Sequence, residues 1–167
     1  MKKLRTILGL ALLVTATAVP SLEAAASNGS TCWQVKDNER AFVRKMNKSR
    51  LNNDLGKLSL DPELSRAANK HTKEMVEDDD LFHTGLTRLG RWVTKWTTLG
   101  ENVGVGGNVK TLHRAFMKSP THRANILLAT FNHVGVSTAR DSDGKLWVTV
   151  VFESTTDPGT TLRMPSC

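Results

Sequence analysis

Ser119 and His122 have the spacing in this sequence that first suggests covalent catalysis. An imidazole three residues after a serine could act as a general base and activate the hydroxyl as a nucleophile. Ser119 is followed by Pro120, however, and this pair is typical of a helix N-cap followed by proline at the first helical position. Because no third group that would orient the histidine can be identified, the sequence does not favour a serine hydrolase.

Histidines and carboxylates offer a second chemistry, the binding of a divalent metal ion such as zinc. Two neutral imidazoles and one carboxylate would leave a coordination position open for water or substrate. The sequence holds no compact motif such as H-E-x-x-H, so metal ligands would have to come from distant segments of the chain. No cofactor can therefore be assigned from local spacing alone.

The start of the chain is laid out like a secretory signal peptide. Basic residues precede an apolar run from Ile7 to Val19, and three alanines ending at Ala26 supply a cleavage site. We expect residues 1–26 to be removed, and residues 27–167 to be secreted as a single domain that is extracellular or held at the cell envelope.

Charge and cysteine content narrow the class of protein further. The net charge is +7 for 167 residues, and it falls to +5 without the leader, which carries three basic residues and one acid. The basic residues are not interleaved with aromatics in one block, so we expect no nucleic-acid partner. No later stretch is long enough to span a membrane, and we expect a monomer. Cys32 and Cys167 are predicted to form a disulfide in the oxidising exterior.

Four amphipathic helices are predicted from apolar periodicity and capping residues. They cover residues 37–51, residues 62 to about 77 behind an Asp61 N-cap, a segment from Val109 to Phe116, and a segment that begins at Pro120. His71 falls on the apolar stripe of the second helix. A lone histidine in such a position is more often a hydrogen-bonded core residue than a ligand.

Two strands at the end of the chain are predicted to form an antiparallel hairpin. Residues 134–139 and 146–152 are rich in β-branched and aromatic side chains, and residues 141–144 form a turn signal between them. Residues 83–107 are rich in glycine and threonine, so we expect mostly loop with brief helical turns. Long irregular segments in small domains often serve function. Helices first and paired strands last indicate an α+β fold.

Five segments, read in order, resemble the bacterial branch of the CAP superfamily, which includes cysteine-rich secretory proteins, insect antigen 5 and plant pathogenesis-related proteins (SCP-like domains). These segments are residues 64–75, 81–83, 100–103, 119–127 and 134–136. The resemblance implies a three-layer α-β-α sandwich with a central antiparallel sheet. It also implies a cleft in which two histidines and one or two acids converge.

Carried over residue by residue, the resemblance implies that His71 is the first cleft histidine, Glu101 the acid and His122 the second histidine. These three are the implied metal ligands, and the cleft set also includes Asn102, Ser119 and Arg123. Residues 115–120 contain no acid where animal and plant members usually have a second glutamate, so a four-ligand metal site is incomplete. His83 also matches a recurrent family position and is expected to be structural.

Three functions are consistent with this sequence. We expect a secreted binding module whose cleft takes a small molecule, lipid, envelope component or protein partner, with an optional divalent metal such as zinc. The first alternative is a metal-dependent hydrolase in which Glu101 acts as general base on a water held by His71 and His122. The second is a non-catalytic extracellular scaffold, in which the cleft residues form a hydrogen-bond network. In any of these functions Glu101 could also accept backbone N–H bonds and fix its glycine-rich loop.

Overall fold

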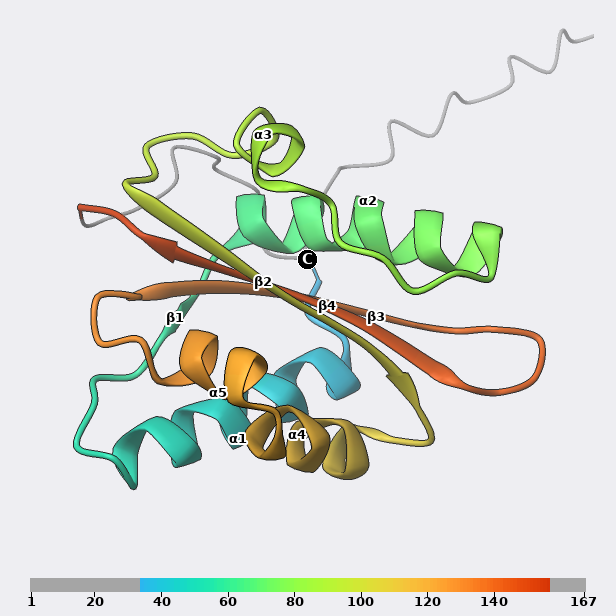
Figure 1. The fold of residues 1–167 in the computed structure, drawn as a ribbon, viewed down its shortest axis with the longest axis horizontal. Helices are drawn as coiled ribbons and strands as arrows, with labels where there is room; N and C mark the ends of the chain where they lie inside the picture. Colours follow the sequence, from blue (N-terminus) through green and yellow to red (C-terminus); the bar gives the residue numbers. More distant parts are fainter. Residues whose placement is uncertain (1–33, 157–167) are drawn as a thin grey trace, which may run out of the picture.

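The computed structural model of the chain describes residues 34–156 (Figure 1). The predicted signal peptide and the predicted Cys32–Cys167 disulfide lie outside these residues and stay predictions. No helix within residues 34–156 combines the length and the apolar character needed to cross a membrane.

A four-stranded sheet forms the middle layer of a three-layer sandwich. Its strands lie in the order β1 (Ser59–Leu60), β3 (His133–Arg140), β4 (Leu146–Ser154) and β2 (Thr98–Gly106). Figure 1 shows α2 (Pro62–Asp78) and α3 (Leu86–Leu89) over one face, and α1 (Asp37–Leu51), α4 (Val109–Lys118) and α5 (Pro120–Leu127) over the other. The predicted α+β class and α-β-α sandwich are confirmed.

The three long strands pair in the antiparallel manner that the resemblance implies. The predicted hairpin is confirmed as β3 and β4, with Val134 opposite Phe152, and β2 pairs with the other edge of β4. The two-residue strand β1 adds a short parallel edge, with Ser59 opposite His133. All nine residues of β4 are buried, so the core lies on both faces of this strand.

The helices begin where their sequence signals place them. Asp61 caps α2, because its Oδ1 accepts the backbone N–H groups of Glu63 at 2.8 Å and Leu64 at 3.0 Å. Ser119 occupies the N-cap position of α5, but its hydroxyl contacts the Thr121 hydroxyl at 3.2 Å instead of capping the backbone. Local periodicity and caps thus fix the helical layers on both faces of the sheet.

Strand β2 is the largest departure from the sequence-based fold, because its residues were expected to form loop. Glycines weaken an isolated strand, and β2 contains three of them. In the fold they make room for aromatic rings: a Cβ at Gly100 would lie 2.8 Å from the Phe131 ring, and one at Gly104 would lie 2.8 Å from the Phe116 ring. Pairing with β4 and this close packing outweigh the poor local propensity.

The buried carboxyl group of Glu153 on β4 makes stability depend on pH. Its side chain is almost fully buried, and its Oε1 has no hydrogen-bond partner among the described residues. Burial, together with the negative charges of Asp61 and Glu63, raises the pKa of Glu153 from 4.5 to about 7. The folded state therefore holds a proton that the unfolded state releases, and this lowers the free energy of unfolding as pH rises from about 4.5 to about 7.

We expect Glu153→Gln to remove this pH-dependent loss of stability. The variant should therefore be more stable than the wild type at pH 8 by about 1–3 kcal/mol. At pH 4 the difference should be much smaller, because the wild-type carboxyl is then protonated in both states. Urea unfolding at the two pH values measures the effect, with the exposed Glu77→Gln as control. An equal stability difference at both pH values would contradict this assignment.

Candidate functional site

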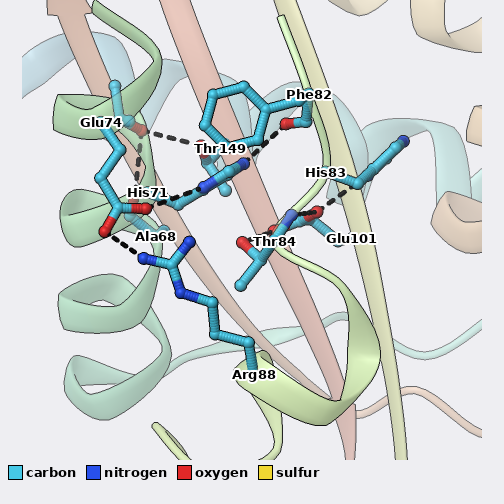
Figure 2. A network of polar contacts seen from close by, with 10 residues as sticks. Ala68, His71, Glu74, Phe82, His83, Thr84, Arg88, Glu101 and Thr149 are labelled. Atoms are coloured by element: carbon cyan, nitrogen blue, oxygen red, sulfur yellow. Dashed lines mark hydrogen bonds and ion pairs between the residues drawn. The ribbon is translucent and has the colours of Figure 1, made fainter. Parts of the chain in front are cut away.

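Glu101 on β2 anchors the segment that leads into α3. Its side chain is only 6% exposed. Its Oε2 accepts hydrogen bonds from Nδ1 of His83 at 2.8 Å and from the backbone N–H of Thr84 at 2.9 Å. Its Oε1 accepts the Thr84 hydroxyl at 2.5 Å, as Figure 2 shows. Glu101 therefore fixes this segment against the sheet.

His83 presents an imidazole that the carboxylate orients. Its side chain is 57% exposed. Because Nδ1 donates to Glu101, the neutral ring has its lone pair on Nε2, which has no hydrogen-bond partner among the described residues. A carboxylate behind a histidine fixes the orientation of the ring and the tautomer that it adopts. The lone pair on Nε2 of His83 can therefore accept a hydrogen bond from a ligand or coordinate a metal ion.

His71, which the resemblance implies as the first cleft histidine, contacts Phe82 and Glu74 and has no hydrogen bond to Glu101. Its ring is fully buried, and its Nε2 donates to the backbone carbonyl of Phe82 at 2.7 Å. Nδ1 lies 3.5 Å from Oε2 of Glu74, whose other oxygen pairs with Arg88 (Figure 2). His71 sits on the apolar stripe of α2, and this position directs it into the packed interior. Its hydrogen bond to the Phe82 carbonyl holds residue 82 against α2.

His122 lies on α5, and its backbone carbonyl is bonded to Asn102 of β2. It is half-buried and packs against the Phe116 ring, with 4.7 Å between ring centroids. Burial lowers the pKa of His122, and the charge of nearby His83 lowers this pKa further. The ring is therefore neutral near pH 7, in the state that binds a metal ion or accepts a hydrogen bond.

Two asparagines hold α5 against β2 and so position His122. The amide nitrogen of Asn102 donates to the carbonyl of His122 at 3.0 Å, and Asn102 is fully buried. The amide of Asn125 donates to Oδ1 of Asn102 at 2.9 Å and to the carbonyl of Glu101 at 3.1 Å. Asn102 thus holds the backbone of His122 against β2 and does not line the pocket described next.

A pocket of about 260 Å³ opens beside Glu101. One part of its wall is apolar, and Leu86 at the rim is 69% exposed. The lining residues are His83, Gly85, Leu86, Leu89, Leu99, Gly100, Glu101 and Asn125. Of the predicted cleft residues, only Glu101 lines this pocket. Arg123 is exposed on α5 and forms no ion pair with the described residues.

The implied ligand set of His71, Glu101 and His122 does not fit a metal ion. His71 is buried with Nε2 bonded to a carbonyl, and nowhere in residues 34–156 do three His, Cys, Asp or Glu side chains come together closely enough to hold one. His83 and His122 form a better pair, because they lie close enough for the charge of His83 to affect His122. In addition, Nε2 of His83 and the ring nitrogens of His122 have no hydrogen-bond partner among the described residues.

The resemblance grouped His71 with Glu101 and His122 in one cleft, whereas the structure bonds Glu101 to His83 and Thr84 and bonds His71 to Phe82. The signal that argued against His71 was its position on the apolar stripe of α2, which predicts burial. The signal for His83 was its exposed setting, in a polar and glycine-containing segment. Thr84 carried no signal, because its two bonds to Glu101 arise only when residues 83–84 fold over β2.

Known proteins resemble this chain in sequence and in fold. A profile of the cysteine-rich secretory protein (CAP) family matches residues 43–152. The uncharacterized protein YkwD of Bacillus subtilis is 28% identical over 65% of this chain, and the chain spans 44% of the length of that relative.

Two solved structures share the fold. An outer surface protein of Borrelia burgdorferi matches with a TM-score of 0.67 and 16% identity, covering 74% of this chain and 97% of that protein. An extracellular SCP-domain protein from Bacillus anthracis matches with a TM-score of 0.63 and 22% identity, covering 71% of this chain and 40% of that protein. With the family profile covering most of residues 34–156, the chain belongs to the cysteine-rich secretory protein (CAP) family and resembles its bacterial members.

Proposed function

We propose that this protein is an extracellular binding module whose ligand site is the pocket beside Glu101. The observation that carries the proposal is the lining of this pocket, where an oriented imidazole and three leucines face one space. Pockets that combine an apolar wall with a few fixed polar groups are the usual form of small-molecule sites. The predicted signal peptide and the extracellular SCP-domain neighbour support the location outside the cell.

The chemistry of the wall indicates a small amphipathic ligand. The outer nitrogen of His83 would accept a hydrogen bond from the polar end of the ligand, while Leu86, Leu89 and Leu99 would cover its apolar part. Glu101 is already engaged in three hydrogen bonds, so its role is to hold His83 and the wall in place. Preorganisation of this kind lowers the entropic cost of binding.

A divalent metal ion such as zinc would be held by His83 and His122, with water or ligand atoms in the remaining positions. Bound there, the ion would act as a Lewis acid toward a ligand oxygen. Glu101 would serve as the carboxylate that orients His83, in the manner common among metal-bound histidines. The hydrolase alternative has less support, because both oxygens of Glu101 are occupied and a general base needs an oxygen free to receive a proton.

Titration of the ¹⁵N-labelled protein with hexanamide tests the site, because this probe has one hydrogen-bonding end and a short apolar tail. We expect chemical-shift changes concentrated in residues 83–89 and 99–101. Leu86→Asp should weaken binding at least about tenfold, since it removes apolar contact at the rim. Leu51→Asp is the matched control, because Leu51 is also an exposed leucine but lies on α1, across the sheet.

Chemical-shift changes elsewhere in the protein, or equal losses of affinity in the two leucine variants, would contradict the proposed site.

A second experiment adds zinc chloride and follows the melting temperature. A zinc-dependent rise that His83→Ala and His122→Ala both lose would support the metal pair. His71→Ala should lower the melting temperature with or without zinc, because Phe82 loses its buried donor.

A further inference from the structure

A second pocket, here called the Trp92 pocket, lies on the outer face of the α2–α3 layer. It has a volume of about 290 Å³, and its lining residues are Arg66, Ala67, Lys70, Arg91 and Trp92. It shares no lining residue with the pocket beside Glu101. Three of its five lining residues are cationic and exposed, so the two pockets differ in chemistry as well as in place.

The ring of Trp92 contacts two cations, Lys70 of the pocket lining and Arg88 of α3. The ammonium of Lys70 lies 4.2 Å from the ring centroid, and the guanidinium of Arg88 lies 4.7 Å from it. Such cation–π contacts restrict long side chains that would otherwise move freely. Trp92 itself packs against a core cluster that includes α2 and β4 residues. The ring that Lys70 and Arg88 contact is therefore held in place.

The positive charge of the Trp92 pocket is only partly neutralised within the protein. Arg88 pairs with Glu74, and Arg66 lies 3.8 Å from Glu63. Lys70 and Arg91 form no ion pair with any of the residues that the structure describes. Moreover, residues 81–100 contain three basic residues and no acid. Like charges collected on one surface repel each other, and an anion that sits between them removes this repulsion.

We propose that the Trp92 pocket binds a linear polyanion that carries phosphodiester groups. Guanidinium groups match phosphate oxygens with paired N–H donors, and lysine adds a point charge, so Arg66, Lys70 and Arg91 suit successive phosphates. The pocket is open and its cations are spread over α2 and the segment after α3, which favours a repeating ligand over one small ion. Because cations cover Trp92, it offers little free ring for base stacking, and this disfavours single-stranded nucleic acid.

Binding of the full chain to poly(glycerol phosphate), measured by biolayer interferometry at low and high salt, tests the proposal. The double variant Lys70→Gln/Arg91→Gln should bind at least about tenfold more weakly. The control double variant Lys110→Gln/Arg114→Gln makes the same charge change on exposed residues of α4, across the sheet. Its affinity should stay within about twofold of the wild type, and both variants should keep the wild-type melting temperature.

Equal weakening by the two double variants would overturn the site, because net charge alone would then explain binding. Failure of the wild type to bind would overturn it as well. Inorganic phosphate alone should compete only weakly, whereas competition as strong as that of the polymer would reject the need for a repeating ligand. Tighter binding to phosphatidylglycerol vesicles or to oligo(dT) would assign the pocket to a membrane or a nucleic acid and reject the polymer.

Discussion

Replacing Gly135 with alanine is expected to destabilise the protein by about 4 kcal/mol or more, enough to unfold a domain of ordinary stability. Gly135 lies on β3 directly beneath α2. A Cβ at this position would lie 2.1 Å from the carbonyl carbon of Leu64 and 2.2 Å from the backbone nitrogen of Ser65. These neighbours are backbone atoms at the start of a helix, so no side-chain rotation relieves the overlap. The helix must move off the sheet and open the packed interior.

Far-UV circular dichroism and urea unfolding measure this effect. Gly107→Ala is the matched control, because a Cβ at Gly107 would meet no atom within 4 Å. The control should change stability by less than about 0.5 kcal/mol. If Gly135→Ala unfolds at the wild-type urea concentration, the close approach of α2 to β3 is wrong. Leu64 and Ser65 amides should also show the largest shifts in any folded fraction.

Replacing Arg50 with alanine is expected to cost about 3–5 kcal/mol. Arg50 is a fully buried cation at the end of α1, and burial lowers its pKa. The hydrogen-bond partners of its guanidinium are four backbone carbonyls. Nε donates to Gly56, Nη1 to Ile126 and Leu128, and Nη2 to Phe131, at 2.7 to 3.0 Å. The variant would leave four carbonyls without these donors and a cavity among three segments.

Arg50→Lys separates geometry from charge. An ammonium has three donors at one point, and it cannot reach carbonyls that a planar guanidinium bonds in four directions. We therefore expect Arg50→Lys to recover only a minor part of the loss in urea unfolding. Arg44→Ala, an exposed arginine on the same helix, should be close to neutral. Full recovery by lysine would show that charge alone stabilises this position.

The sequence predicted the helical layers and the final hairpin because their signals are local. The apolar stripe of α2 and its Asp61–Pro62 start lie within a few residues of each other, and the β3–β4 turn lies between its own two strands. It could not predict β2 as a strand, because glycines at positions 100, 104 and 106 argue against one locally. The advantage of Gly100 and Gly104 appears only when Phe131 and Phe116 pack against them.

For the site, ordered motifs along the chain were enough to predict the family and to single out Glu101 and His122 as candidate cleft residues. The packing of distant segments is what bonds His83 and not His71 to Glu101, and what brings Lys70 and Arg91 into one pocket with Trp92. The physical reason is the same in both cases. Helix periodicity tells which way a side chain points from its own backbone, but the partner it meets depends on how distant segments pack.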